Sequence, residues 1–169
     1  EFNVNVPKPL AVKGWNYIKS WLDRELKGMM ALGCCYETVT YINFVLSSYP
    51  DESWTGGIFN EEYRRQLLDY SFAQWKSHSP LLKGYLALTL KRMKRPEQAK
   101  LVWDSVLDSA KNTEELGTYW APESRSWLWY NDTVETQAFA LRVLSELDPG
   151  NKHNEGLVQW LFLNKKLNN

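Results

Sequence analysis

The chain has 169 residues, which is enough for one domain with a buried core, and its 20 basic and 20 acidic residues cancel. This balance leaves no electrostatic footprint for nucleic acid or an anionic membrane, and no segment approaches the roughly 18 uninterrupted apolar residues of a membrane span. We therefore expect no nucleic-acid partner and no direct membrane insertion.

The beginning of the chain indicates a fragment. It opens with Glu1-Phe2, the dipeptide that an EcoRI cloning site encodes, and it lacks an initial methionine. We expect an excised piece of a longer protein, with residues 1–2 as a cloning remnant and residues 1–9 as an extended lead.

Apolar residues recur at helical spacing through the first half of the chain. Residues 10–27 predict a helix that stops at Gly28, with an apolar face made by Leu10, Trp15, Ile18, Trp21, Leu22 and Leu26. The β-branched and aromatic residues of 34–48 would also suit a strand. We prefer a helix there, because one side is lined at helical spacing by Cys34, Thr38, Tyr41, Val45 and Ser48. After a loop at 51–59, Asn60 is placed to cap a third helix containing Tyr63, Leu67, Tyr70, Phe72 and Trp75.

Four further helices are expected in the second half. Ser79-Pro80, an N-cap followed by proline at the first helical position, predicts a helix that runs to about Met93. Pro96 opens the next helix, to about Lys111, whose apolar stripe is Ala99, Val102, Trp103, Val106 and Leu107. Residues 112–131 predict a long aromatic loop.

The last two helices are predicted at residues 133–147 and 154–166, separated by a turn at Asp148-Pro149-Gly150. In the helix over 133–147, the core positions are expected to be Val134, Ala138, Leu141 and Leu144. Nothing in the chain predicts a convincing sheet. About seven helices with short connections favour an all-α fold of antiparallel helix hairpins, and we expect residues 1–169 to form a single domain.

Two acids, Asp132 and Glu135, directly follow an aromatic segment that contains Trp127, Trp129 and Tyr130. Two carboxylates roughly 6.5–9.5 Å apart beside aromatic side chains would be typical of an inverting glycosidase. However, Asp132 falls at the N-cap of the predicted helix and Glu135 at its third position, which is a capping-box arrangement. Both acids also complement the helix dipole. We therefore interpret the pair as a helix cap.

The other reactive or charged side chains predict structural roles. Cys34 and Cys35 are adjacent, which argues against a disulfide framework or metal-ligand spacing and indicates small buried thiols on a helix. His78 and His153 have no companion at metal spacing, so we expect surface or capping roles. The basic run 91–95 ends a helix and is expected to be solvated. The sequence thus predicts no enzyme, no cofactor, and no catalytic, cofactor-binding or metal-binding residue.

The last third resembles the thioester-domain region of bacterial α2-macroglobulin-like proteins. The shared pattern is an aromatic loop, an acidic cap, and then a helix pair marked by Glu135, Thr136, Ala138, Leu141, Leu144, Pro149, the run 158–161, and Asn164-Lys165. The segment 79–110 looks like the preceding helix pair of the same domain. The resemblance covers about residues 79–169, and residues 1–78 more loosely.

This resemblance implies an α/α-toroid, in which paired helices form inner and outer rings. About seven helices are too few for the full double ring, so the chain would be the later part of the domain within a multidomain parent. Proteins of this family are secreted or periplasmic and trap proteases after a bait region is cut. The resemblance therefore implies an extracytoplasmic location, with proteases and neighbouring domains of the parent as partners.

The family's internal thioester joins a Cys and a Gln in a Cys-x-Glu-Gln motif, which residues 35–38, Cys-Tyr-Glu-Thr, match only superficially. Thr38 has no carboxamide to supply the acyl carbon, and the segment lies well inside the helical run. We therefore interpret Cys35 as structural. Either the true motif lies upstream of this fragment, or the parent traps proteases without a covalent bond.

Two other functions remain open. Residues 84–110 have the look of a tetratricopeptide hairpin, with small residues at Gly84, Ala87 and Ala99, although no second copy appears at a 34-residue period. Such a scaffold would bind a peptide or protein partner in its concave groove. The aromatic loop from Trp120 to Tyr130 would instead suit an α/α-toroid glycosidase or a glycan-binding module.

The capping interpretation makes a direct prediction. Asp132→Ala should lower the free energy of unfolding by about 1 kcal/mol and the melting temperature by a few degrees, because a helix cap is lost. Thermal unfolding monitored by circular dichroism measures this change. Unchanged stability together with a lost binding or hydrolytic activity would show that the acids form an active site.

Overall fold

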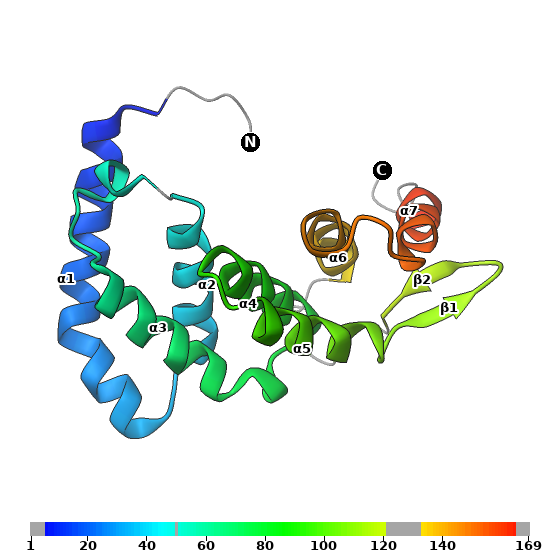
Figure 1. Ribbon diagram of the computed structural model, residues 1–169, viewed down its shortest axis with the longest axis horizontal. Coiled ribbons are helices and arrows are strands. Elements are labelled where there is room, and N and C mark those ends of the chain that lie inside the picture. Colours follow the sequence, from blue (N-terminus) through cyan, green and yellow to red (C-terminus); the bar gives the residue numbers. More distant parts are fainter. Residues whose placement is uncertain (1–5, 50, 121–132, 165–169) are drawn as a thin grey trace. The chain divides into compact units, whose positions relative to one another are not determined.

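The computed structural model describes residues 6–49, 51–120 and 133–164 (Figure 1). Over these residues it contains seven α-helices, two short 3₁₀ helices and one β-hairpin, so the predicted all-α class is confirmed. Of the helices in these ranges, none combines the length and apolar character needed to cross a bilayer. The chain divides into two compact units, Glu1–Ala73 and Gln74–Asn169. The single domain and the toroid stay predictions.

The first unit contains three α-helices: α1 (Lys8–Leu32), α2 (Tyr36–Ser47) and α3 (Glu61–Ala73), with the 3₁₀ helix η1 (Glu52–Thr55) before α3. Its core is aromatic and aliphatic, and its buried members are Trp15, Leu22, Leu26, Met29, Val39, Leu46, Phe59, Leu67 and Tyr70. The Trp15 ring packs edge-on against both Phe59 and Tyr49. On the predicted apolar face of α1, Trp15, Leu22 and Leu26 are buried and two further residues are half-buried, whereas Leu10 is 63% exposed.

The predicted stop of α1 at Gly28 is wrong, and so is the extended lead at Lys8 and Pro9, which belong to the helix. A glycine inside a helix costs only about 1 kcal/mol relative to alanine, and burial of Met29 one residue later favours continuing the helix. The helix ends instead at Gly33, in the left-handed conformation with φ of 62°. Its N–H and that of Cys34 both donate to the Met29 carbonyl. This is a typical glycine C-cap.

The helical prediction for 34–48 is confirmed by α2, but the predicted face is wrong. Its buried residues are Val39, Thr40, Asn43, Phe44 and Leu46, while Thr38, Tyr41 and Ser48 are exposed. The face includes polar residues that an apolar pattern overlooks. The buried Asn43 amide donates to the Ser71 hydroxyl of α3 at 3.2 Å, which satisfies one of its donors.

The predicted cap of α3 is confirmed, because the Asn60 Oδ1 accepts from the Tyr63 N–H at 2.8 Å. The helix ends at Ala73, two residues before the predicted Trp75, which lies in the 3₁₀ helix η2 (Trp75–Ser77) of the second unit. Within α3 the Tyr70 hydroxyl lies 2.8 Å from the Met29 carbonyl and 2.6 Å from that of Cys34. Tyr70 thereby ties α3 to the turn that joins α1 and α2.

The second unit is built around α4 (Pro80–Arg92), which packs against α5 (Pro96–Leu107) and α6 (Thr133–Leu147). The predicted start of α4 is confirmed, since the Ser79 hydroxyl accepts from the Leu82 N–H. Its buried residues lie on all sides of the helix: Leu81, Leu82, Gly84, Tyr85, Leu86, Ala87, Leu88, Thr89 and Leu90. A helix that is apolar all round belongs in a core, so α4 is the central element of this unit.

Residues 112–131 are not entirely loop, because an antiparallel hairpin precedes the aromatic segment. Strand β1 (Lys111–Thr113) pairs with β2 (Gly117–Tyr119), in the register Lys111 to Tyr119 and Thr113 to Gly117. Three-residue strands are too short to display an alternating pattern, so periodicity could not reveal them. Residues 121–132 lie outside the described part of the chain.

The hairpin, yellow-green in Figure 1, packs on α7 (His153–Asn164), which is red. Two glycines allow this contact: a Cβ on Gly117 would collide with the Gly156 carbonyl oxygen, and one on Gly156 would lie 2.8 Å from the Thr118 nitrogen. The Gln159 amide then donates to the Glu114 and Glu115 carbonyls at 3.0 and 3.2 Å. Backbone contact and side-chain bonds together fix the hairpin on the helix.

The prediction of a helix over 133–147 is confirmed, whereas its predicted core positions are only partly right. Leu144 is buried and Leu141 half-buried, but Val134 and Ala138 are exposed. The inward face is instead Thr136, Gln137, Ala140, Val143 and Leu144. Near its start, α6 buries the polar side chains of Thr136 and Gln137. The prediction, which followed apolar residues from Val134, therefore chose a different side of the helix. The following turn leads into α7, which begins one residue before the prediction.

Close packing of the hairpin on α7 makes Gly156 a sensitive position. Gly156→Ala should lower the free energy of unfolding by about 1–3 kcal/mol, because the added methyl group meets the backbone of β2. The control is Gly150→Ala, where a Cβ meets nothing within 4 Å and the change should stay within about 0.5 kcal/mol. Urea unfolding of both variants measures the difference, and equal stability would contradict the packing described here.

Candidate functional site

The first turn of α6 holds Glu135, one of the two acids considered for catalysis. Its carboxylate accepts a hydrogen bond at 3.3 Å from the hydroxyl of Tyr85, a residue of α4 that is 4% exposed. The Tyr85 ring packs edge-on against Phe139, with 4.5 Å between ring centroids. Asp132, the other acid and the predicted N-cap, lies outside the described residues. Glu135 therefore joins α6 to α4 near the start of the helix.

Close contact between α4 and α6 depends on Gly84. A Cβ at that position would lie 3.0 Å from Phe139 and 3.2 Å from Val143, which is tighter than ordinary van der Waals contact. The missing side chain therefore leaves room for the Phe139 ring on the surface of α4. This small residue, which the sequence associated with a helix hairpin, serves the contact between α4 and α6.

Trp120 begins the aromatic segment and is 4% exposed. Its indole Nε1 donates to the Val106 carbonyl at 2.9 Å, and its ring is 6.5 Å from that of Trp103. The Trp120 carbonyl accepts from the Gln137 amide of α6 at 3.5 Å. Trp120 is thus part of the core, without the exposed ring face that sugar stacking requires. The remaining aromatic residues of the segment, Trp127, Trp129 and Tyr130, lie outside the described residues.

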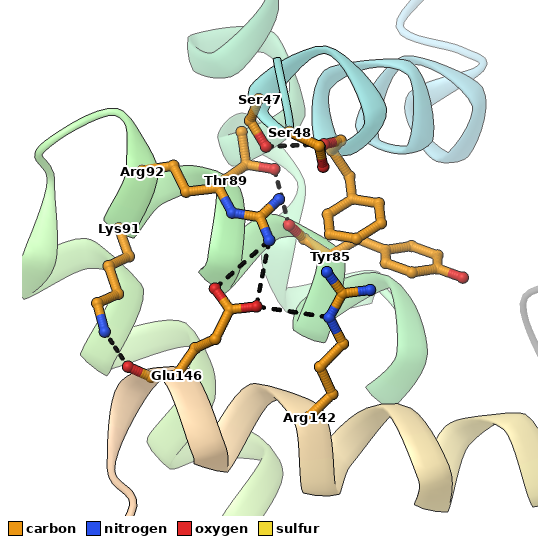
Figure 2. A network of polar contacts seen from close by, with 9 residues as sticks. Ser47, Ser48, Tyr85, Thr89, Lys91, Arg92, Arg142 and Glu146 are labelled. Carbon is orange, nitrogen blue, oxygen red and sulfur yellow. Dashed lines mark hydrogen bonds and ion pairs between the residues drawn. The ribbon is translucent and has the colours of Figure 1, made fainter. Parts of the chain in front are cut away.

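A charged network joins the other ends of the same two helices (Figure 2). The Glu146 carboxylate of α6 accepts from Arg92 of α4 at 3.2 Å and from Arg142, one turn earlier on α6, at 3.4 Å. Lys91 also donates to the Glu146 carbonyl. The expectation that the run 91–95 is only solvated is therefore wrong for Lys91 and Arg92. Lys94 has φ of 60° in the turn before α5.

The two histidines differ in their surroundings. His78 is 6% exposed, so the expected surface position is wrong, although it does follow η2 as a C-cap residue. His153 starts α7 and is half-buried, with its Nδ1 3.5 Å from the Thr118 hydroxyl. Burial, and then the charge of Lys152, lower its pKa below the ordinary value. Within the described ranges, no three His, Cys, Asp or Glu side chains group together as a metal would require.

The two cysteines correct the expectation of buried thiols on a helix. Both lie in the turn between α1 and α2, where Cys34 is half-buried and Cys35 is exposed as the N-cap residue of α2. Their sulfur atoms are 3.0 Å apart. The following residues of the Cys-Tyr-Glu-Thr segment form the first turn of α2, with Thr38 exposed.

Among the described residues of the second unit, the candidate side chains do not gather at one centre. In the second unit, Glu135, Trp120, His153 and the basic run each contact a different neighbour, and each contact joins elements of the fold. Tyr85, Arg142 and Glu146 were not predicted from the sequence. A signal existed for the last two, since opposite charges four residues apart on a helix predict an ion pair, but nothing local pointed to Arg92 as their third partner.

Comparison of the chain with protein-family models, with curated proteins and with solved structures finds no match.

The charged network predicts a measurable coupling between α4 and α6. In a double-mutant cycle of Arg92→Ala and Glu146→Ala, we expect a coupling of about 0.5–1 kcal/mol at low salt, because both partners are only partly exposed. The coupling should shrink near 1 M salt, where the screening length falls to about 3 Å. The matched cycle of Lys100→Ala and Asp104→Ala, an exposed pair on α5, should give a smaller coupling. Equal couplings in the two cycles would contradict this assignment.

Proposed function

We propose that the chain is a non-catalytic structural part of an α2-macroglobulin-like protease inhibitor and contributes to trapping through the conformation of the whole parent protein. The observation that carries the proposal is that the side chains of Glu135 and Trp120 form hydrogen bonds within their own unit. These residues were the best candidates for hydrolysis or sugar binding, and they contact Tyr85 and Val106 of their own unit. Side chains that serve the fold in this way favour a structural role.

The boundaries of the second unit's helices also support the proposal. The segment that resembles the thioester domain begins at residue 79, and α4 starts at Pro80 with Ser79 as its cap. The helix pair α6 and α7 follows the marked pattern, with a turn at Asp148-Pro149 and Trp160 buried in the last helix. A resemblance in apolar pattern therefore falls on helices that pair in the same unit.

The surface of α7 suits contact with neighbouring domains. Phe162 is 70% exposed, and Val158 and Leu163 on the same helix are also exposed. Apolar groups at the surface are favourable places for association between domains of a chain. In this proposal the exposed apolar side chains of α7 face other domains of the parent. The parent acts outside the cytoplasm, and proteases bind to the assembled protein.

A tetratricopeptide-like scaffold is the second candidate, because two antiparallel helix pairs follow one another in this unit. Gly84 lets Phe139 of the second pair approach the first, as stacked hairpins require. Such a scaffold would bind a peptide or protein partner in its groove. A glycosidase or glycan-binding module gains no support from Trp120, whose ring is buried.

The test uses the protein encoded by the complete reading frame, mixed with a panel of purified proteases. A trapped protease is shielded from large substrates but stays open to small ones, because its active site is not occupied. We expect digestion of a large protein substrate to fall strongly while hydrolysis of a short chromogenic peptide continues. A shift of the parent's mobility in native gels should accompany the inhibition.

Two controls separate the alternatives. A protease with its active-site nucleophile replaced cannot cut a bait region and should produce no shift, and the chain of 169 residues alone should not inhibit. Equal inhibition of large and small substrates, or no inhibition at all, would count against the proposal. Capture of a defined peptide by the chain, lost on substitution of inner helix faces, would favour the scaffold instead.

A further inference from the structure

The turn between α1 and α2 places two thiols side by side in an unusual backbone. Gly33 has φ of 62° and Cys35 has φ of 64°, so two residues of the turn adopt the left-handed conformation. Side chains other than glycine, asparagine and aspartate seldom adopt it, and such outliers concentrate at functional positions. In this turn the Cys34 and Cys35 sulfur atoms lie 3.0 Å apart, within hydrogen-bond distance for two thiols.

Neighbouring aromatic residues hold this turn in place. Tyr36 stacks on Tyr70 with 4.4 Å between ring centroids, and the Tyr70 hydroxyl lies 2.6 Å from the Cys34 carbonyl. Burial raises the pKa of Tyr70 to about 12, so the hydroxyl remains a hydrogen-bond donor near neutral pH. The backbone of Cys34 is thereby tied to α3.

Access from solvent differs between the two thiols. Cys35 is exposed, whereas Cys34 is half-buried beside the core of the first unit. An exposed thiol meets a reagent first, and a shielded neighbour reacts with whatever is attached there. This is the arrangement of an attacking and a resolving cysteine.

We propose that Cys34 and Cys35 form a redox modification site, which exchanges with small-molecule disulfides such as glutathione disulfide and closes reversibly to a disulfide between adjacent residues. This site is independent of the proposed role in protease trapping. It requires no thioester and no glutamine.

The exchange balances in two steps. The Cys35 thiolate attacks one sulfur of the small-molecule disulfide, which forms a mixed disulfide and releases one thiolate that takes up a proton. The Cys34 thiolate then attacks the Cys35 sulfur and displaces the second thiolate, which is also protonated. Two protein thiols are oxidised and one small-molecule disulfide is reduced to two thiols.

Geometry favours the second step over the first. The hydrogen bond with Cys34, followed by burial and by the charges of Cys34 and Glu37, raises the pKa of Cys35, so its thiolate is scarce at neutral pH. Once the mixed disulfide exists, however, the Cys34 sulfur is already adjacent and attacks within the same molecule. The sulfur atoms need to approach from 3.0 Å to about 2.05 Å. We therefore expect slow capture followed by rapid closure.

The closed form should be easy to reduce. Neighbouring Cα atoms in a trans chain are only about 3.8 Å apart, closer than the usual range of about 4.4–6.8 Å for a disulfide. A disulfide at this spacing is strained, and strained or exposed disulfides are the labile and regulatory ones. Excess thiol should thus reopen it.

The experiment treats the reduced chain with glutathione disulfide, stops the reaction with acid and measures intact mass. Wild type should lose the mass of two hydrogen atoms and retain no glutathione, and excess glutathione should restore the original mass. Cys34→Ser should instead accumulate a stable adduct on Cys35, with glutathione release at least about tenfold slower than in wild type. Cys35→Ser should remain largely unmodified.

A second measurement avoids reliance on the variants. A trivalent aryl arsenical that bridges two thiols should bind the reduced wild-type chain with its helical circular dichroism unchanged, and should fail to bind after oxidation. A persistent glutathione adduct on wild type, a disulfide between two chains, or no arsenical binding by the folded chain would each overturn the proposal.

Discussion

Contact between α4 and α6 is the constraint on which the rest of the second unit depends. Gly84 provides space for Phe139, and the buried Tyr85 then reaches the Glu135 carboxylate. Farther along the two helices, Arg92 pairs with Glu146. Burial of apolar surface along α4 supplies most of the stabilisation, since partly exposed ion pairs contribute little, and the polar contacts at the two ends set how the helices align.

The sequence predicted helices well because their signals are local. Asn60 and Ser79 cap helices as expected, and the limits of α6 agree with the prediction. Predictions of the buried helix faces failed where polar side chains are buried. Thr136 and Gln137 face the core, so a stripe of apolar residues misplaces the inner side of α6. Short strands escaped notice for a similar reason, because three residues do not establish a period of two.

The candidate site was harder to predict than the fold, because its contacts join distant parts of the sequence. Glu135 was recognised, but its partner Tyr85 lies 50 positions earlier, and no spacing rule connects them. The cysteines show the opposite difficulty. Their adjacency is obvious in the sequence, yet composition reveals neither the left-handed backbone at Cys35 nor the exposure of its side chain.

Direct backbone contact between β2 and α7 has a consequence for local unfolding in this unit. The Gly156 carbonyl lies where any Cβ on Gly117 would be, and Gln159 holds the carbonyls of the strand connection. A hairpin of two three-residue strands has little stability of its own in water. The hairpin is therefore stabilised mainly by its contact with α7. The two should open and close as one cooperative segment, so that fraying of α7 also releases the strands.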